Sequence, residues 1–370
     1  MKIVNLVSPY ISPTCTWLQN TMVLNSKFEN IVFTQKKITI QKNILVIGPD
    51  EFNIINFLTN RILRKVFLIS GFGFEKYYLQ HKPKIFHSHF LYECYYWHYF
   101  TTKFKIPHVV SVYGHDISEY GKLVKWKKRY SKIFNLIDKV IVEGPNMANN
   151  LEKMGCPSTK VEIIPIGIDS SDITIKKDYR IENRIKILQV ASFKEKKGIE
   201  YTLLAVSEAK KNNLEIDLYL IGDGELKNKY IEIINREGIV ENVHFLGFVI
   251  PEIVRRTLYM YDIFIHPSVL AENGDTEGGF PVILTEACAA GLPIISTYHA
   301  DIPFIIHNEI NGILVPERDY VSLYESIYKL FINQDLREKY GTNSIEVVRN
   351  KFTIEKQIET LNALYNSLIK

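Results

Sequence analysis

Short apolar runs alternate with stretches of helical spacing along most of this 370-residue chain. Apolar runs of this kind predict buried strands, and helices between them predict a parallel sheet that is covered on both faces. The pattern fades in the polar, non-periodic residues 170–184 and then starts again, which marks a boundary. The expected strands are KIVNLV, KIFHSHF, HVVSVYG, KVIVEG and VEIIPIG before this boundary, and KILQVAS, LEIDLYLIGDG, NVHFLG, DIFIHPS and LPIIST after it.

The pattern therefore predicts an α/β protein of two domains, which the length also favours. We place the first domain at residues 1–169, a linker at residues 170–184 and the second domain at residues 185–350. Residues 351–370 contain an amphipathic helix, and its apolar stripe has to be covered by another part of the protein.

Composition and charge exclude several classes of protein. The net charge of +4 is too small for a protein that coats nucleic acid. No apolar run approaches ~20 residues, so we expect no segment that spans a bilayer. The first apolar run is too short for a signal peptide, and the four cysteines are far apart without metal-clip or redox spacing. Free thiols in the cytoplasm are the expectation.

Residues 277–297, EGGFPVILTEACAAGLPIIST, carry the strongest functional signal. They predict a tight turn at Gly278 and Gly279, followed by a helix that Phe280 and Pro281 open. We expect the proline at the first helical position, where its missing N–H has no cost. The backbone N–H groups at the helix start, up to Val282, form an anion site suited to a phosphate.

Two carboxylates flank this expected phosphate site. Glu277 precedes the turn, and Glu286 lies more than one turn into the helix. A carboxylate, a diphosphate cradle and a second carboxylate are what a nucleotide-sugar donor requires. An ordinary βα unit with a glycine turn and two surface acids remains the alternative for this segment alone.

Ordered motifs elsewhere give the chain a likeness to a known family. The second half resembles the retaining glycosyltransferases of family 4, which have the GT-B fold, and the likeness extends over residues 84–365. Several motifs in order are more specific than any one of them. The matching motifs besides residues 277–297 are HSHF, SVYGHDIS, GCPSTKVEIIPIGID, KKGIEYTLLAV, LIGDGEL, VHFLGFV, DIFIHPS and NGILVP.

The resemblance implies two facing Rossmann-like domains, with the C-terminal helix crossing back to the first. The substrates it implies are a nucleotide-diphosphate sugar donor and a glycan or lipid-linked glycan acceptor in surface polysaccharide biosynthesis. It also implies that Glu277 binds sugar hydroxyls, Glu286 binds the ribose and Lys197 contacts the diphosphate. Gly222 would meet the nucleotide through its backbone. A solvated lysine at position 197 and a helix-surface acid at position 286 are the competing interpretations.

The chain departs from the family pattern at three places. Eight residues separate Glu277 from Glu286, where the family has seven, and an added glycine in the turn permits the longer spacing. Ser192 stands where the family often has an arginine on the diphosphate. Tyr113 occupies the position of the family histidine and His115 the variable position after it, so either side chain is a candidate to face the sugar.

The sequence predicts no metal and no cofactor. No D-x-D motif follows a strand, and Asp223 in GDGEL is expected to stabilise a turn. We expect His87 and His89 to point to opposite faces of a strand, which disfavours a two-histidine metal site. Residues 71–73, GFG, lack the third glycine of a dinucleotide fingerprint and predict a turn.

Two helical segments of the first half carry unusual side chains. Residues 122–134 combine basic residues with an apolar stripe that includes Trp126 and Tyr130. This stripe predicts either a helix docked on the sheet or one that lies on an anionic membrane surface. Residues 92–100 hold aromatic side chains on more faces than core packing needs, which suggests a grip on a lipid or sugar acceptor.

The sequence thus predicts a metal-independent retaining glycosyltransferase, cytoplasmic or peripheral on the inner face of the plasma membrane. A nucleotide-sugar epimerase or a phosphorylase of the same fold is one alternative. A catalytically weak nucleotide-sugar-binding partner subunit is another, because of the altered glutamate spacing and Ser192.

Overall fold

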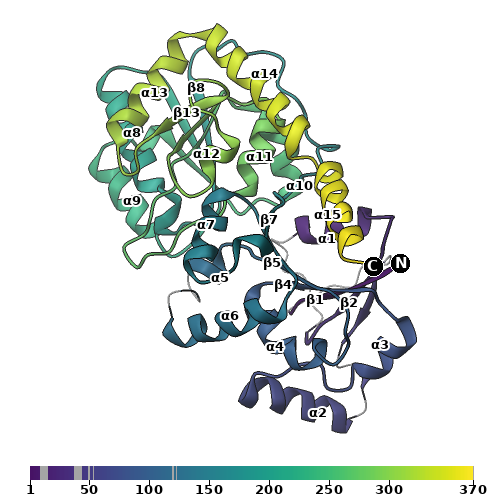
Figure 1. Ribbon diagram of the computed structural model, residues 1–370. Coiled ribbons are helices and arrows are strands. Elements are labelled where there is room, and N and C mark those ends of the chain that lie inside the picture. Colours follow the sequence, from purple (N-terminus) through teal and green to yellow (C-terminus); the bar gives the residue numbers. More distant parts are fainter. Residues whose placement is uncertain are drawn as a thin grey trace. The chain divides into compact units, whose positions relative to one another are not determined.

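The chain of this computed structural model divides into two compact units (Figure 1). The first unit comprises Met1–Gly167 with Ile354–Lys370, and the second comprises Ile168–Thr353. Residues 170–184 therefore lie within the second unit. The structure describes residues 1–8, 16–36, 44–48, 51–52, 54–118, 121 and 123–369.

The first unit is built on a seven-stranded sheet in the order β3-β2-β1-β4-β5-β6-β7, in which every described pair is parallel. The strands are β1 (Lys2–Leu6), β2 (Glu29–Phe33), β3 (Leu45–Ile47), β4 (Ile85–His89), β5 (His108–Ser111), β6 (Lys139–Val142) and β7 (Val161–Ile163). The helices are α1 (Thr16–Leu24), α2 (Ile54–Ile62), the π-helical turn η2 (Leu63–Phe67), α3 (Glu75–His81), α4 (Leu91–Thr101), α5 (His115–Ser118), α6 (Val124–Leu136), α7 (Pro145–Lys153), the short η4 (Ser158–Lys160) and α15 (Ile354–Leu368).

The second unit has a six-stranded parallel sheet in the order β10-β9-β8-β11-β12-β13. The strands are β8 (Ile185–Val190), β9 (Ile216–Ile221), β10 (Val243–Gly247), β11 (Ile263–His266), β12 (Ile294–Thr297) and β13 (Gly312–Val315). The helices are α8 (Ile199–Lys211), α9 (Lys227–Arg236), α10 (Pro251–Thr257), α11 (Val282–Ala289), α12 (Ile302–Ile305), α13 (Tyr320–Ile332) and α14 (Gln334–Lys351), with short turns η5 (Glu195–Lys197), η6 (Val240–Asn242) and η7 (Leu258–Met260).

Strand geometry explains why both faces of the second sheet are covered. Successive side chains of a strand point to opposite faces. In β11, Ile263 and Ile265 lie in one buried core, whereas Phe264 between them lies in the other. A strand that is buried on both faces reads as a continuous apolar run, which is the pattern found in the sequence.

The C-terminal helix α15 packs within the first unit, as the fold prediction expected. Leu361 and Tyr365 are buried in a core with Ile3 and Ile85 of the central strands. The amides of Asn25 on α1 and Asn362 on α15 also hydrogen-bond at 2.8 Å. The apolar stripe of this helix is therefore covered by the first unit, although the chain reaches it only after completing the second.

Helix α6 confirms the docking interpretation of its apolar stripe. Trp126, Tyr130, Ile133 and Phe134 are buried in a core with α4 and the sheet. The aromatic side chains therefore do not face outward. The basic residues lie on the opposite face, where Lys125, Lys127 and Lys128 are exposed.

Most aromatic side chains of α4 serve packing, and the suggested grip on an acceptor stays a prediction. The helix lies between two cores, so apolar residues on several of its faces are buried: Trp97 belongs to one core and Cys94 to the other. Two of the tyrosines meet cations, with Arg64 4.2 Å from the ring centre of Tyr96 and Arg129 5.2 Å from that of Tyr95.

All ten expected strands are present, and the sequence reading missed three others. Strands β2 and β3 lie in the weakly patterned residues before 80, and β13 was recognised only as a family motif. Gly71 and Gly73 form the expected turn with φ of 104° and 86°. Cys94, Cys156 and Cys288 are free and buried, whereas Cys15 lies outside the described residues. None of the helices in the described part of the chain combines the length and the hydropathy that a membrane span needs.

Candidate functional site

The site lies where the chain leaves the central strands β8 and β11 of the second sheet. These strands are neighbours, but β8 continues to β9 on one side and β11 to β12 on the other. In open α/β sheets, ligands bind outside the carboxyl ends of strands at such a switch point. Lys197 follows β8 and Glu277 follows β11, so the fold brings these two predicted residues together.

Lys197 and Glu277 form a close ion pair. The Nζ atom of Lys197 lies 2.8 and 2.7 Å from the two carboxylate oxygens, and the hydroxyl of Ser268 donates to Oε1 at 2.8 Å. The side chains are only 15% and 6% exposed. Burial alone would raise the pKa of Glu277, but the charge of Lys197 holds that pKa well below its usual range. The site therefore presents a buried, ionised carboxylate beside a lysine, and Lys197 is not a solvated surface residue.

Glycine allows the loop of Lys197 to approach the loop of Glu277. Gly198 has φ of 62°, and a β-carbon there would lie 1.8 Å from the carbonyl oxygen of Pro267. Gly222 is equally constrained, with φ of 133° and a β-carbon position 1.9 Å from the carbonyl oxygen of Ala191. Any larger residue at either position would push these loops apart. Gly222 thus has a packing role in any case, and its predicted contact with a nucleotide stays a prediction.

A buried histidine fixes the backbone of Glu277, and the sequence analysis did not identify it. Nε2 of His299 lies 3.3 Å from the backbone nitrogen of Glu277 and 2.8 Å from the hydroxyl of Thr276. Because a backbone N–H can only donate, Nε2 accepts, and Nδ1 carries the proton that is donated to Glu317 at 2.7 Å. The signal that could have found His299 is its place just after the carboxyl end of β12.

His266 at the end of β11 is a second buried histidine beside the site. Its Nε2 lies 3.6 Å from Oε1 of Glu277, which is too long for a hydrogen bond. Burial lowers the pKa of His266, so the ring is neutral at physiological pH. It contributes a polar but uncharged wall next to the carboxylate.

The turn and helix after Glu277 form largely as predicted. Gly278 takes the left-handed conformation with φ of 81°, which accommodates the extra residue of the turn. Pro281 is extended and caps the helix, whose first residue is Val282, so the expectation of proline as first helical residue was wrong by one position. Phe280 is buried against Phe352, and only its backbone can face a ligand. Gly279, also buried, accepts a hydrogen bond from the backbone of Asp301 at 3.1 Å.

Glu286 is half-buried on α11 and interacts with an arginine that the sequence did not reveal. Nη1 of Arg255 lies 3.6 Å from Oε1 of Glu286, and Nε of Arg255 donates to both carboxylate oxygens of Asp172 at 2.9 Å. Burial raises the pKa of Glu286 to about 7, against the opposing charge of Arg255. A surface acid would not be perturbed in this way. Nothing in the sequence around Arg255, PEIVRRT, distinguishes it from a surface residue.

Two other predicted features of the second unit are on the surface. Ser192 is exposed in the loop after β8. Asp223 accepts from the backbone of Gly224 at 2.8 Å and pairs with Lys227 at 3.2 Å, which agrees with its expected role in a turn. No cluster of three metal-ligating side chains occurs among the residues that the structure describes.

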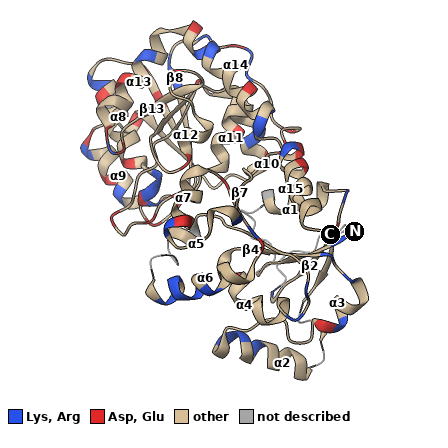
Figure 2. Ribbon diagram, in the orientation of Figure 1, with Lys and Arg blue, Asp and Glu red and all other residues tan. Residues whose placement is uncertain are grey.

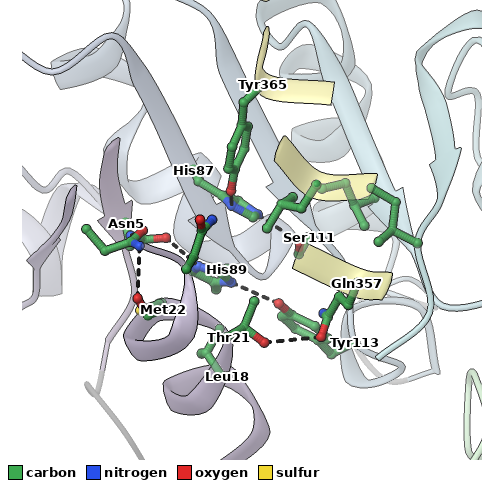
Figure 3. A pocket seen from close by; sticks show the side chains of 15 residues that line it. Asn5, Leu18, Thr21, Met22, His87, His89, Ser111, Tyr113, Gln357 and Tyr365 are labelled. Atoms are coloured by element: carbon green, nitrogen blue, oxygen red, sulfur yellow. Dashed lines mark hydrogen bonds between the residues drawn. The ribbon is translucent and has the colours of Figure 1, made fainter. Parts of the chain in front are cut away.

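In the first unit, Tyr113 belongs to a polar network at the carboxyl end of the sheet (Figure 3). Its hydroxyl lies 2.8 Å from Nδ1 of His89, whose Nε2 lies 3.0 Å from the amide oxygen of Asn5. Burial lowers the pKa of His89 to about 3. His89 therefore acts as a neutral hydrogen-bonding group that holds Tyr113 in place.

The expectation for the two histidines of β4 was wrong. The rings of His87 and His89 stack with centres 4.3 Å apart, because residues two apart in a strand share a face. His87 lies 2.6 Å from the hydroxyl of Tyr365 on α15 and 2.8 Å from that of Ser111. Both rings are committed to hydrogen bonds in a cavity of about 30 Å³, room for roughly one water.

His115 begins α5, but its side chain lies outside the described structure. Its neighbour Asp116 is buried and accepts from the backbone N–H groups of Leu91 and Tyr113 at 2.8 and 3.1 Å. Burial raises the pKa of Asp116 to about 7, although these N–H groups oppose the rise. The aspartate thus fixes the turn that carries Tyr113.

Comparison with protein families covers most of the chain. Residues 39–172 match the model of Glycosyltransferase Family 4, and residues 171–347 match that of Glycosyl transferases group 1. The chain is 32% identical over 222 residues to the amylovoran biosynthesis glycosyltransferase AmsK of Erwinia amylovora, covering 60% of this chain and 54% of that protein. It is 30% identical over 215 residues to the putative colanic acid biosynthesis glycosyltransferase WcaL of Escherichia coli, covering 58% and 53%. The chain thus spans just over half the length of these relatives.

Solved structures share the whole fold at low sequence identity. Sucrose-phosphate synthase from Thermosynechococcus elongatus superposes with a TM-score of 0.79 and 17% identity over 100% of this chain and 99% of that one. HepE of Anabaena, solved in complex with UDP, gives 0.77 and 13% over 99% of each chain. These likenesses show the GT-B fold that was predicted.

Proposed function

The chain belongs to the group 1 glycosyltransferases of family 4, and from this premise we propose that it transfers a sugar from a nucleotide-diphosphate donor to a hydroxyl acceptor with retention of anomeric configuration. The observation that carries the proposal is the buried Lys197–Glu277 pair, next to the start of α11, at the carboxyl ends of β8 and β11. The donor therefore binds in the second unit.

The charges of this site suit the demands of glycosyl transfer. Negative charge develops on the diphosphate as its bond to the sugar breaks, and stabilising that charge is the main task of the protein. In our proposal the diphosphate lies between Lys197 and the N–H groups from Gly279 to Val282. Ser192 supplies no charge, so Lys197 and the helix start neutralise the diphosphate in this proposal, with the exposed Lys194 of the same loop as a further candidate.

The two glutamates bind different parts of the donor in this proposal. Glu277 accepts hydrogen bonds from sugar hydroxyls, and the charge of Lys197 beside it holds its pKa low and keeps it ionised. Glu286 accepts hydrogen bonds from the ribose. Tyr113 or His115 is the group that we propose for recognition of the sugar, and within the first unit the buried His89 orients the hydroxyl of Tyr113.

The acceptor and the place of action are further parts of the proposal. The relatives AmsK and WcaL are named for the biosynthesis of amylovoran and colanic acid, two polysaccharides. We therefore propose a glycan or lipid-linked glycan acceptor in surface polysaccharide assembly. The protein would act in the cytoplasm, peripherally on the anionic inner face of the plasma membrane, which the exposed lysines of α6 favour.

Donor screening and turnover assays on the purified protein test this function. A panel of nucleotide sugars in a thermal-shift assay identifies the donor, since a ligand stabilises the folded state that binds it. Transfer to an added glycan acceptor supports the proposal. Release or rearrangement of the sugar without a carbohydrate acceptor would indicate a phosphorylase or an epimerase, and binding without turnover would indicate a partner subunit.

A further inference from the structure

Helix α2 and the adjoining turn η2 expose an apolar stripe on the first unit. Six large aliphatic or aromatic side chains within 14 residues are each between 48% and 73% exposed. A stripe of this kind normally faces a core or a partner, and exposed apolar patches mark interaction sites. The six residues are Ile54, Ile55, Leu58, Ile62, Val66 and Phe67.

The stripe cannot be buried by a rotation of the helix, because its opposite face is anchored. Asn60 is fully buried and donates to the side chain of Gln35 at 2.8 Å. Arg64 donates to Ser70 at 2.7 Å and forms an ion pair with Glu93, a buried residue of α4. The exposure of the apolar face is therefore part of the folded state of the first unit.

Exposed cations border this stripe, in a segment of sequence without acidic residues. Residues 52–74 contain no aspartate or glutamate, and Arg61 and Lys65 are exposed beside the apolar side chains. Helix α6 also packs on α4, and its segment from Leu123 to Leu136 has no acidic residue either. Figure 2 shows Lys and Arg along both α2 and α6.

An apolar stripe that is flanked by cations fits the interface of an anionic bilayer better than it fits another protein. Amphipathic surfaces bind there by burying apolar side chains at the headgroup boundary while Lys and Arg meet anionic lipids. Isoleucine, leucine, valine and phenylalanine make no hydrogen bonds, so the stripe offers a protein partner little specificity. Helix α6 by itself could not insert into a bilayer in this way, because its apolar stripe is buried.

We propose that α2 and η2 are a membrane-insertion element, and that the lysines of α6 add electrostatic attraction to the same anionic surface. The proposal extends the membrane part of the proposed function. The proposal involves no catalytic step. It assigns membrane insertion to α2 and η2, whereas the sequence had suggested the basic helix α6.

Vesicle co-sedimentation of the full chain tests this proposal. The wild type should sediment with vesicles of phosphatidylcholine and phosphatidylglycerol, and much less with phosphatidylcholine alone. The double variant Ile62→Asp/Val66→Asp should lose about tenfold or more of its partitioning, because it removes apolar area and adds negative charge. Its control is Ile332→Asp in the second unit, which changes an isoleucine of similar exposure, 62% against 56%, and should bind as the wild type does.

Further measurements distinguish lipid binding from dimerisation through the stripe and from an effect on catalysis. Lys65→Glu should weaken binding at low salt but less at high salt, because surface charge is screened. A wild type that stays in the supernatant, or a double variant that sediments equally, overturns the proposal. So does a wild-type dimer in light scattering that the double variant abolishes without any vesicle binding. Turnover with a soluble acceptor and no vesicles should be unchanged in the double variant, so a failure of the transferase proposal would be seen separately.

Discussion

Replacing Lys197 with methionine should destabilise the second unit, because the change leaves Glu277 buried without its cation. The lost interaction comprises two charge-assisted hydrogen bonds, at 2.8 and 2.7 Å, to a side chain that is 6% exposed. Removing one partner of a buried pair costs about 3–5 kcal/mol. Ser268 keeps its hydrogen bond to the carboxylate, so we expect the lower end, about 3 kcal/mol.

Two companion variants make this prediction specific. Lys194→Met changes an exposed lysine of the same loop and should alter the free energy of unfolding by less than about 0.5 kcal/mol. The double variant Lys197→Met/Glu277→Gln should recover most of the lost stability, because it removes the unpaired charge, but it should remain inactive. All three tryptophans lie in the first unit, so urea unfolding of the second unit is followed by far-UV circular dichroism alongside fluorescence.

The loss of stability in Lys197→Met should depend on pH, and the pKa of Glu277 sets the direction of this dependence. The pKa of Glu277 is held low in the wild type, so the pair contributes its stability at neutral pH and loses it only in strong acid. Without Lys197, burial raises the pKa of Glu277, and the carboxyl accepts a proton as the pH falls. The deficit of Lys197→Met should therefore shrink from pH 7 toward pH 5. A deficit as small as that of Lys194→Met, or one without this pH trend, would refute the reasoning.

Three further predictions concern the donor site, the metal requirement and the C-terminal helix. Donor affinity, measured by calorimetry, should rise as the pH increases through about 7, because Glu286 has to be ionised to accept hydrogen bonds from the ribose hydroxyls. The variant Glu286→Gln should flatten this pH profile. The variant Glu286→Ala should abolish most activity without unfolding the protein. Transfer should proceed in EDTA, and an absolute requirement for added manganese or magnesium would contradict this. Truncation after Val348 removes α15, so it should expose the core side chains of Ile3 and Ile85 that this helix covers, and should reduce solubility and transfer while some donor binding persists. Full solubility with unchanged turnover would rule this out.

The sequence predicted the strands of both sheets well where each strand is a continuous apolar run. It missed β3, which has three residues, and β2, which lies in a segment without helical signals on both sides. The error at His87 and His89 was one of geometry, because the period of a strand places them on the same face. The packing of the aromatic side chains of α4 was not foreseen, because a helix between two cores has no single buried face.

Motif order pointed to the candidate site, but the sequence could not reveal what fixes its geometry. Lys197 and Glu277 are 80 positions apart, and only the fold brings them within hydrogen-bonding distance. Arg255 beside Glu286 acts through tertiary contacts and has no local sequence signature. His299, which accepts from the backbone N–H of Glu277, had only its place after β12 as a signal. The close approach of the loop that contains Gly198 to the loop that follows β11 could not be predicted from sequence either, since it depends on the position of Pro267.

The central claim is that the second unit binds a nucleotide-diphosphate sugar and that the protein transfers its sugar with retention. The most direct measurement is an NMR time course with the donor that the thermal-shift panel identifies and a glycan acceptor. It follows the anomeric protons of donor and product. We predict a product with the anomeric configuration of the donor, formed only with acceptor present and lost in Glu286→Ala. An inverted product, or sugar released at the same rate without acceptor, would contradict the claim.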